Sequence, residues 1–470
     1  MRKKAVRQKK RMEKMRISDL KGKKIAVWGL GTEGVQAVRY LTAKEITDKI
    51  VLFNDTEAEK PECCRPFELI CGEKIAASLN RAEVIIRSPG VSIYREELAE
   101  ARRRGIVVTS VTDLCLNEFL SRPGCRVIGV SGSKGKSTSV SVLAYILRET
   151  GHKAALGGNI GRPMIELLDD DYEFVVEEFS SYQASDLTVS PQIAMFTNLY
   201  YVHTDWHRGH ENYCRDKIHL IANQKPGDVY FANRRNPQLV EYTRPYAENC
   251  CWYNEAEVFH AEDGVLYRGK EKLADIRELK LSGKHNMDNL AGVFSVLEYL
   301  GIDVRRAAEI LKDFEPLPHR LQKVAEKEGV VFINDSISTA PEAAIGAMGS
   351  FNGNLILISG GQDNEQDYSD YAETVENNER VKAVITLYQT GPKIAGVLRE
   401  FVRRPGFENI EAKTLEEAVQ TAFDKLKSLG GGTVLFSPTS PSFGFYKNFI
   451  ERGNHFIKIV YPSAIYGQTF

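Results

Sequence analysis

One glycine-rich loop constrains the fold of this chain more than any other feature. An apolar segment at residues 126–130 predicts a strand, and residues 140–147 carry apolar side chains at helical spacing. The loop between them consists of Gly132, Ser133, Lys134, Gly135, Lys136, Ser137 and Thr138. A strand, glycine loop and helix in this order direct backbone N–H groups and the positive end of a helix dipole at phosphate oxygens. We therefore expect ATP to bind here.

Individual side chains of this loop predict how ATP is held. Lys136 is expected to bind the outer phosphates, and Ser137 or Thr138 to offer a hydroxyl to Mg²⁺, which takes oxygen ligands. The full GxxxxGK[ST] pattern lacks its first glycine because Val130 stands there, although Gly129 is adjacent. The alternative is a turn that binds nothing, and the surrounding residues favour a phosphate loop.

Strands and helices alternate along most of the chain, which predicts an α/β protein with largely parallel sheets. A length of 470 residues allows two to four domains. We expect a basic, disordered tail at residues 1–16, a Rossmann-like domain at 17–112, a central P-loop ATPase-like domain at 113–316 and a second Rossmann-like domain at 317–470.

The charge balance argues against a polyanionic partner. The 62 Lys and Arg side chains nearly cancel 63 Asp and Glu side chains, so no strong field would attract nucleic acid or an anionic membrane. No apolar run approaches the roughly 20 residues that cross a bilayer. The eight cysteines include no CxxC pair and are typical of reduced cytoplasmic thiols. We expect a cytoplasmic monomer that acts on small molecules.

The first predicted domain opens with a second glycine motif. A strand at residues 24–28 leads into Gly29, Gly31 and Gly34 in GxGxxG spacing, and the next strand ends at Asp55 and Thr56. This pattern is typical of nucleotide-binding half-folds, in which the acidic residue meets a ribose hydroxyl. NAD-dependent redox chemistry and simple strand-to-helix packing are both alternatives.

Further polar residues follow strands of the central domain. Glu178 ends a strand that begins at Phe174, so its carboxylate is a candidate Mg²⁺ ligand at the carboxyl edge of the sheet. His203, Asp205, His207 and His210 follow the strand at residues 193–197 and raise zinc as an alternative, although no cysteine pair accompanies them. Lys217, on a helix expected to begin near Asn212, could face either solvent or the interior.

The ordered set of motifs resembles the Mur ligases, ATP-dependent enzymes that add amino acids to the UDP-muramoyl precursor of peptidoglycan. The pieces that carry the resemblance are residues 132–138, 157–161, 178–183, 283–286, 318–320, 334–336 and 437–438, with Asn198, His203 and Asn289. Residues 442–449 and 451–456 are similar to the members that add glutamate to UDP-N-acetylmuramoyl-L-alanine.

The resemblance implies a role for each matching residue. Those near the UDP-linked acceptor would be Gly31, Thr32, Asp55, Thr56, Ser88 and Asn159. Those that contact ATP, besides the loop, would be Asn286, Arg320 and Asp335, and because they lie in two domains, domain closure would assemble the site. The catalytic set would be Lys136, Glu178, His203 and Lys217. Two Mg²⁺ ions would be held by Ser137, Glu178, His203 and Lys217, the last as a carbamate. Glutamate would meet Thr339, Ser442 and Phe449.

The implied reaction joins a carboxylate to an amine. The alanine carboxylate attacks the γ-phosphate of ATP to give an acyl phosphate, and the amine of the incoming amino acid then displaces phosphate. The product is an amide, with ADP and phosphate released.

Two departures from the resemblance bear on which glutamate isomer is used. Members that add D-glutamate usually carry lysines where this chain has Ile337 and, after Gly360 and Gly361, residues 362–365. Residues 203–207, 336–339 and 440–444 look closer to a subfamily that adds L-glutamate, which we favour. D-glutamate, a folate polyglutamate synthase and a non-catalytic nucleotide-binding homologue are the alternatives.

Overall fold

A computed structural model describes residues 14–158, 161–200, 204–281, 284–363 and 366–461. Their contacts form two compact units, which are described separately. Unit 1 contains the described residues up to Glu278 together with Asn286–Phe314, and unit 2 contains those of 279–285 and from Glu315 onward. The predicted domain boundaries stay predictions.

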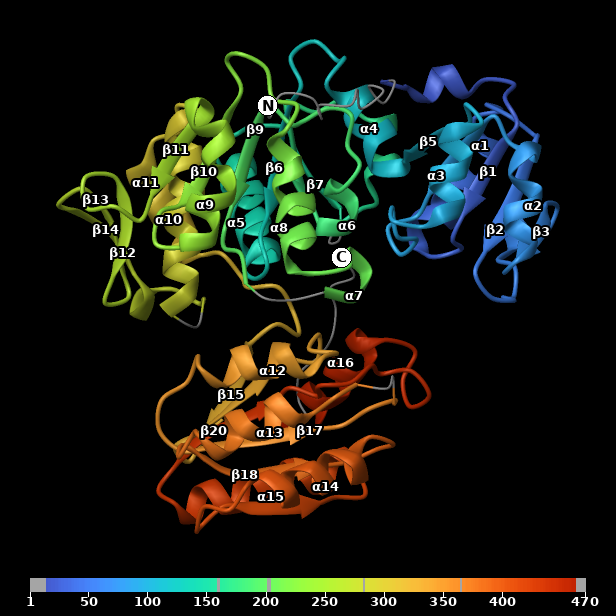
Figure 1. Ribbon diagram of the computed structural model, residues 1–470. Coiled ribbons are helices and arrows are strands. Elements are labelled where there is room, and N and C mark those ends of the chain that lie inside the picture. The colour runs from blue at the N-terminus through green and yellow to red at the C-terminus, as the bar shows by residue number, and fades with distance from the viewer. Residues whose placement is uncertain (1–13, 159–160, 201–203, 282–283, 364–365, 462–470) are drawn as a thin grey trace, which may run out of the picture. The chain divides into compact units, whose positions relative to one another are not determined.

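Unit 1 begins with a five-stranded parallel sheet in the order β3-β2-β1-β4-β5 (Figure 1). Its elements are β1 Ile25–Trp28, α1 Thr32–Ala43, β2 Ile50–Asn54, β3 Glu68–Cys71, α2 Lys74–Ser78, β4 Val84–Arg87, α3 Glu96–Arg103, β5 Val107–Ser110 and α4 Val111–Phe119. One face packs on α2 and α3 and the other on α1 and α4, which is why its strands are apolar throughout. The predicted strand, glycine turn and helix at β1 and α1 are confirmed.

A six-stranded parallel sheet follows in the order β11-β10-β9-β6-β8-β7. Its strands are β6 Arg126–Ser131, β7 Ala154–Gly158, β8 Phe174–Glu178, β9 Ile193–Phe196, β10 Val229–Asn233 and β11 Cys250–Tyr253. Its helices are α5 Lys136–Glu149, α6 Ser181–Ala184, α7 Thr204–His207, α8 His210–Ile218, α9 Pro237–Thr243, α10 Lys284–Tyr299 and α11 Val304–Lys312. The 3₁₀ turns of unit 1 are η1 Ile17–Leu20, η2 Glu62–Cys64, η3 Leu79–Arg81, η4 Met164–Asp169, η5 His219–Ile221, η6 Arg244–Asn249 and η7 Ile276–Glu278.

A small antiparallel sheet interrupts the predicted alternation. It consists of β12 Phe259–Glu262, β13 Val265–Arg268 and β14 Glu271–Asp275. The first turn is Asp263-Gly264, and both residues have positive φ, 48° and 81°. Asp-Gly is a strong signal for a two-residue hairpin, so the sequence carried a cue that the prediction of parallel strands missed.

The two parallel sheets of unit 1 share one hydrophobic core. Val27 of the first sheet, Leu114 of α4 and Val175 of the second sheet belong to the same cluster of buried side chains. A buried ion pair also joins them, because Arg87 at the end of β4 lies 2.7 Å from Asp186, which follows α6. Met15 belongs to this core as well, and residues 1–13 of the predicted basic tail lie outside the described residues.

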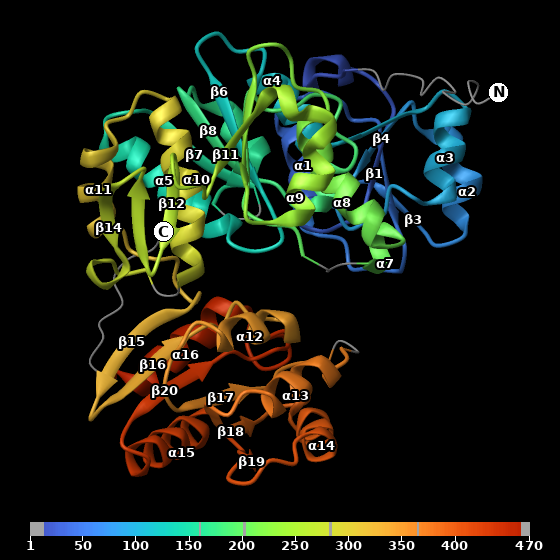
Figure 2. The same cartoon turned by 60° about the vertical axis from the view of Figure 1, so that its left-hand side comes forward.

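Unit 2 is a second α/β body with a six-stranded sheet in the order β15-β16-β20-β17-β18-β19. Its elements are β15 Gln322–Lys327, β16 Val330–Asn334, α12 Pro341–Met348, β17 Leu355–Ser359, α13 Ser369–Glu376, β18 Val381–Thr386, α14 Gly391–Phe401, β19 Glu408–Glu411, α15 Leu415–Ser428, β20 Gly432–Phe436 and α16 Phe449–Val460. All strands are parallel except β15. Helices α12, α13 and α14 cover one face (Figure 2), and α15 and α16 cover the other. The predicted α/β class with mostly parallel sheets is confirmed.

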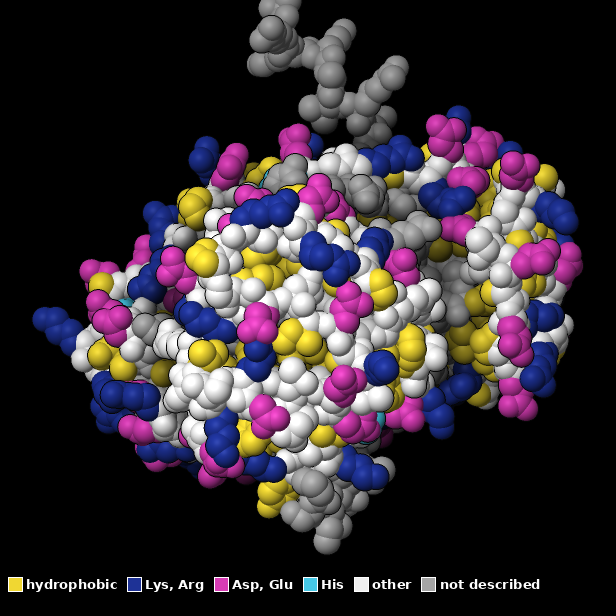
Figure 3. Space-filling model, turned by 90° about the horizontal axis from the view of Figure 1, so that it is seen from below, with side chains coloured by type: hydrophobic (Ala, Val, Ile, Leu, Met, Phe, Trp, Pro, Cys, Tyr) yellow, Lys and Arg dark blue, Asp and Glu magenta, His cyan; other side chains and the backbone are white. Residues whose placement is uncertain are grey.

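The surface carries both signs of charge. On the face in Figure 3, basic and acidic side chains are interspersed, as the near-neutral composition predicts. No helix formed by the described residues is long and apolar enough to span a membrane.

Candidate active site

The predicted phosphate loop lies between β6 and α5. Gly135 is the N-cap of α5 with φ of 85°, a left-handed conformation that glycine adopts without strain. A Cβ at this position would lie 2.3 Å from the side-chain nitrogen of Asn289. Both the left-handed backbone and the close side chain of Asn289 therefore require glycine at this position. The turn brings the N-terminus of α5 to the carboxyl edge of the sheet.

Side chains from the end of the neighbouring strand β9 hold this loop in place. Asn198 accepts a hydrogen bond from the Lys134 amide at 2.8 Å and donates one to the Lys134 carbonyl at 3.0 Å. Thr197 donates to the same carbonyl at 2.6 Å. The loop is thus fixed in shape without a ligand, which lowers the ordering entropy that phosphate binding would otherwise cost.

Three charged side chains meet at the loop. Glu178 is the last residue of β8, and one of its oxygens lies 4.0 Å from Lys136 Nζ. The other oxygen, Oε2, is buried and has no hydrogen-bond partner among the described residues. Lys217 reaches the loop from α8 and donates from Nζ to the Gly132 carbonyl at 3.0 Å. The structure therefore brings together three of the four predicted catalytic side chains.

The environment of Lys217 is unusual for a lysine. Its side chain is buried, and burial lowers the pKa of its amine well below the ordinary value, helped by the positive charge of Lys136. The ring of Tyr213 lies 5.2 Å from Nζ. The question of whether Lys217 faces solvent or the interior is settled in favour of the interior, and α8 begins at His210, two residues before the predicted start.

A buried hydrogen-bonded group anchors the helix that carries Lys217. His207 lies 2.6 Å from Asp216 through Nδ1 and 2.9 Å from Ser181 through Nε2. Tyr94 of the first domain also donates to Asp216 at 3.0 Å. His207, considered above for zinc, therefore orders α8. Among the side chains that the structure describes, no three His, Cys, Asp or Glu are grouped to hold a metal.

The structure says less about four other predicted residues. His203 and Asn159 lie outside the described residues. Ser137 is buried in the first turn of α5, and Thr138 beside it is half-buried.

The residues predicted to hold the UDP group lie at the carboxyl edge of the first sheet. Gly31 is the N-cap of α1, and Thr32 is its first residue. Ser88 follows β4 and donates to the Gly29 carbonyl at 2.8 Å. Asp55 follows β2 with Thr56 and accepts a hydrogen bond from the Trp28 indole at 3.1 Å. The structure brings these residues to one edge, as predicted.

Unit 2 gathers its predicted residues around Asp335. This buried carboxylate accepts hydrogen bonds from Ser338, from Ser437 and from the Leu321 amide, and burial raises its pKa to about 6. Arg320 is the residue before Leu321. Asn286 belongs to unit 1, where it is buried in the first turn of α10.

Hydrogen bonds of a buried arginine connect the segments that carry the predicted glutamate residues. Ser336 donates to the Phe449 carbonyl, and Arg452 donates to Ser336 and to the Ser440 carbonyl. Ser442 is buried two residues further along the same loop. Thr339 follows the Asp335 segment, and its carbonyl accepts a hydrogen bond from Gln366.

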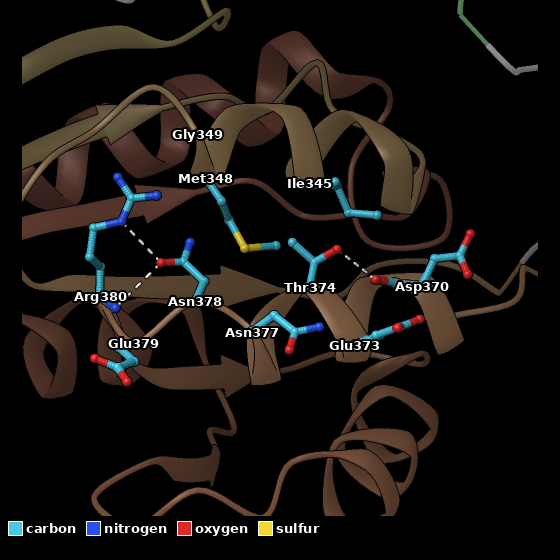
Figure 4. A pocket seen from close by; sticks show the side chains of 10 residues that line it. All are labelled: Ile345, Met348, Gly349, Asp370, Glu373, Thr374, Asn377, Asn378, Glu379 and Arg380. Atoms are coloured by element: carbon cyan, nitrogen blue, oxygen red, sulfur yellow. Dashed lines mark hydrogen bonds between the residues drawn. The ribbon is translucent and has the colours of Figure 1, made fainter.

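A broad surface hollow of about 900 Å³ lies elsewhere in unit 2, over α12 and α13. Figure 4 shows the side chains that line it, among them Met348, Asp370, Thr374 and Arg380. None of the predicted site residues lines it. The volume of this hollow therefore gives no reason to place the predicted site there.

Sequence reasoning gave no role to two carboxylates near the first glycine motif, one half-buried and one fully buried. The half-buried Glu33 of α1 accepts a hydrogen bond from Gln183 at 2.7 Å, across 150 residues of sequence. Glu177 precedes Glu178 and is fully buried, and neither of its oxygens has a partner among the described residues. One sequence signal could have separated Glu177 from Glu178. Side chains alternate along a strand, so adjacent residues of β8 lie on opposite faces of the sheet.

Comparisons with known proteins agree with this arrangement. Residues 130–297 match the family described as the Mur ligase middle domain, and residues 23–110 match the MurD-like N-terminal domain of Mur ligases. The chain is 36% identical over 463 residues to the UDP-N-acetylmuramoyl-L-alanine--L-glutamate ligase of Xanthomonas oryzae pv. oryzae, covering 96% of this chain and 98% of that protein. It is 34% identical over 466 residues to a protein of the same name from Micromonospora sp., covering 96% and 99%.

Solved structures show the same fold at low sequence identity. The UDP-N-acetylmuramate-alanine ligase of Thermotoga maritima has a TM-score of 0.54 at 18% identity, covering 94% of this chain and all of that one. The MurF ligase of Thermotoga maritima in complex with ADP has a TM-score of 0.55 at 15% identity, covering 94% and 95%.

Proposed function

The chain belongs to the Mur ligase family of ATP-dependent amide ligases, which serve peptidoglycan precursor synthesis, and from this premise we propose that it joins L-glutamate to UDP-N-acetylmuramoyl-L-alanine. The observation that carries the proposal is the arrangement of Lys136, Glu178 and Lys217 at the phosphate loop. The acceptor and the isomer are those that the names of the Xanthomonas and Micromonospora relatives give.

The phosphate loop accounts for activation of a carboxylate. Lys136 and the start of α5 would neutralise charge on the γ-phosphate of ATP as the substrate carboxylate attacks it. Because the loop is already held by Asn198 and Thr197, these groups need no reorganisation during the reaction. The acyl phosphate that forms would then be attacked by the amine of glutamate, with release of phosphate.

The family uses Mg²⁺, and the side chains at the loop fit such an ion. Glu178 offers a buried oxygen without a partner, and Ser137 offers a hydroxyl at the start of α5. A bound Mg²⁺ would neutralise part of the charge on the phosphates. His203 and a modified Lys217 are proposed to hold a second ion.

We propose that Lys217 carries a carbamate in the active enzyme. Carbamylation needs a neutral amine, whose nitrogen bonds to the carbon of CO₂ and loses a proton, and burial favours the neutral form by lowering the pKa of this amine. The product is an oxygen anion that Mg²⁺ accepts. Lys217→Ala is expected to lose nearly all activity, and bicarbonate with a short carboxylic acid to restore part of it. Full activity of the alanine variant would refute the carbamate.

The proposed glutamate site differs from that of D-glutamate ligases in its positive charges. Ile337 and residues 362–365 stand where those enzymes usually carry lysines. Thr339, Ser442 and Phe449 are proposed to contact the amino acid, and the buried Arg452 donates to the Ser440 carbonyl in the segment that carries Ser442. D-glutamate remains the second candidate, whereas a non-catalytic homologue is disfavoured because Lys136, Glu178 and Lys217 are all present.

The remaining assignments complete the proposal. The UDP group would lie at the carboxyl edge of the first sheet beside Gly31, Thr32, Asp55, Thr56 and Ser88. Asn286, Arg320 and Asp335 would contact ATP, and Asn159 would lie near the acceptor. We propose that the enzyme works as a monomer in the cytoplasm.

The acceptor can be tested by phosphate release. Purified protein with ATP and Mg²⁺ is expected to release phosphate only when UDP-N-acetylmuramoyl-L-alanine and glutamate are both present. Omitting the acceptor serves as the control. Equal release without the acceptor, or no release with both substrates, would refute the proposal.

A further inference from the structure

A second polar cavity lies within unit 1, away from the phosphate loop. It has a volume of about 180 Å³ and is lined by the start of α1, the start of α4, the start of η4, Gly158 and the end of β8. Six of its lining side chains are polar: Thr32, Glu33, Gln36, Thr112, Glu177 and Gln183. Thr32 is also one of the residues proposed to hold the UDP group, and the proposed mechanism gives no role to the other five.

Glu177 gives this cavity an unpartnered buried carboxylate. The residue is fully buried, and neither carboxylate oxygen has a hydrogen-bond partner in the part of the chain that the structure describes. A Cβ at Gly157 or at Gly158 would lie 2.6 Å from one of these oxygens, so two consecutive glycines leave the space that the carboxylate occupies. Because Glu178 is next to it on β8, the two carboxylates project from opposite faces of the sheet. Glu177 therefore does not belong to the phosphate-loop group.

Glu33 faces the same cavity from the first domain. It accepts hydrogen bonds from Gln183 at 2.7 Å and Thr112 at 3.3 Å, both uncharged donors. The buried guanidinium of Arg87 is bound to Asp186 by two hydrogen bonds, of 3.0 and 2.7 Å, so its charge is already matched. Among the described side chains, none forms an ion pair with either glutamate.

A buried carboxylate that faces a second, half-buried carboxylate, with no ion pair to either among the described side chains, needs a compensating charge. We propose that this cavity binds a divalent cation of the Mg²⁺ class between Glu33 and Glu177. The polar lining offers carboxylate, hydroxyl and amide oxygens, which suits a hard cation, and the volume leaves room for the waters that Mg²⁺ retains. Met164 also lines the cavity, but its thioether is a soft donor that such a cation does not select. Since α1 carries Glu33 and β8 carries Glu177, the ion links the two sheets of unit 1. This inference stands without the proposed reaction, because it concerns cation binding alone.

Manganese binding tests the proposal, because Mn²⁺ replaces Mg²⁺ and free Mn²⁺ is counted by electron paramagnetic resonance. Full-length protein without nucleotide is titrated alongside E177Q, E33Q and E173Q. We expect E177Q to lose one Mn²⁺ per chain and E33Q to bind that ion at least ~10-fold more weakly. E173Q, altered at a half-exposed carboxylate directly before β8, is the matched control and should keep the cavity ion. Excess Mg²⁺ should displace it.

A second readout separates ion binding from a folding defect. Mg²⁺ should raise the melting temperature of the wild-type protein and of E173Q, but not that of E177Q, provided that the circular dichroism of the variants is unchanged. Equal Mn²⁺ stoichiometry in E177Q and wild type would overturn the proposal. Infrared spectroscopy gives a second contradicting result. If wild-type protein at saturating Mn²⁺ still shows the band of a protonated carboxyl, and E177Q lacks that band, then a proton neutralises the pair and the proposal is overturned. Neither result depends on which amino acid the enzyme adds.

Discussion

The ion pair between Arg87 and Asp186 should control how firmly the two sheets of unit 1 hold together. The pair is two-pronged, and its side chains are 0% and 3% exposed. Arg87 also donates to four backbone carbonyls, so removing its side chain leaves these four acceptors without this donor. Asp186→Leu keeps the branched shape of the side chain but leaves the guanidinium charge buried without a partner.

The expected loss follows from that burial. Removing one partner of a buried, hydrogen-bonded ion pair costs about 3–5 kcal/mol. At about 2 °C per kcal/mol for a unit of this size, the melting temperature should fall by roughly 6–10 °C. In the double variant R87M/D186L no charge remains unpaired, so its loss should be smaller than the sum of the single losses by about 2 kcal/mol.

Tryptophan fluorescence can follow this transition selectively. All three tryptophans of the chain, Trp28, Trp206 and Trp252, lie in unit 1. Arg162→Met removes the pair with Asp170, whose side chains are about half exposed, and should cost less than about 1 kcal/mol. Two results would refute the reasoning. In one, the stability losses of the two single variants add up to that of R87M/D186L within ~0.5 kcal/mol. In the other, Asp186→Leu loses as little stability as Arg162→Met.

Two further predictions test the loop and unit 2. Gly135→Ala should lower kcat/KM for ATP by roughly 100-fold, since its Cβ would displace Asn289 at the loop. Gly151→Ala, with φ of 94° but open space, should cost only about 1 kcal/mol of stability and leave kcat/KM unchanged; equal effects in the two variants would contradict this. His319 is buried, its Nδ1 accepts a hydrogen bond from Asn334 at 2.9 Å, and burial lowers its pKa to about 4. Because the unfolded chain binds this proton near pH 6.5, the free energy of unfolding should be constant above that pH and fall as the pH drops toward 4. An NMR titration midpoint of the His319 ring near 6.5 would refute the burial effect.

Local patterns predicted much of this protein. The phosphate loop, the turn at Gly31 and the strand that ends in Glu178 are encoded by consecutive residues, so the sequence alone places them at sheet edges. The inward position of Lys217 was left open because one helix turn does not show what packs against it.

Contacts between distant segments could not be predicted in the same way. Glu33 meets Gln183 only because α1 packs against the central domain, and His207 changes from a loop histidine to a buried anchor because Asp216 and Ser181 reach it. The hairpin at Asp263, unlike these contacts, could have been predicted. Its Asp-Gly turn signal is present in the sequence, but the expectation of parallel strands outweighed it.

The most direct test of the central claim is a competition between the two glutamate isomers. Protein, ATP, Mg²⁺ and UDP-N-acetylmuramoyl-L-alanine are incubated with equal amounts of ¹³C-labelled L-glutamate and unlabelled D-glutamate, and the product is weighed by mass spectrometry. The proposed function predicts that the product carries the heavy label almost exclusively. A product that is predominantly unlabelled would contradict L-glutamate specificity, and the absence of any glutamyl product would contradict the ligase assignment itself.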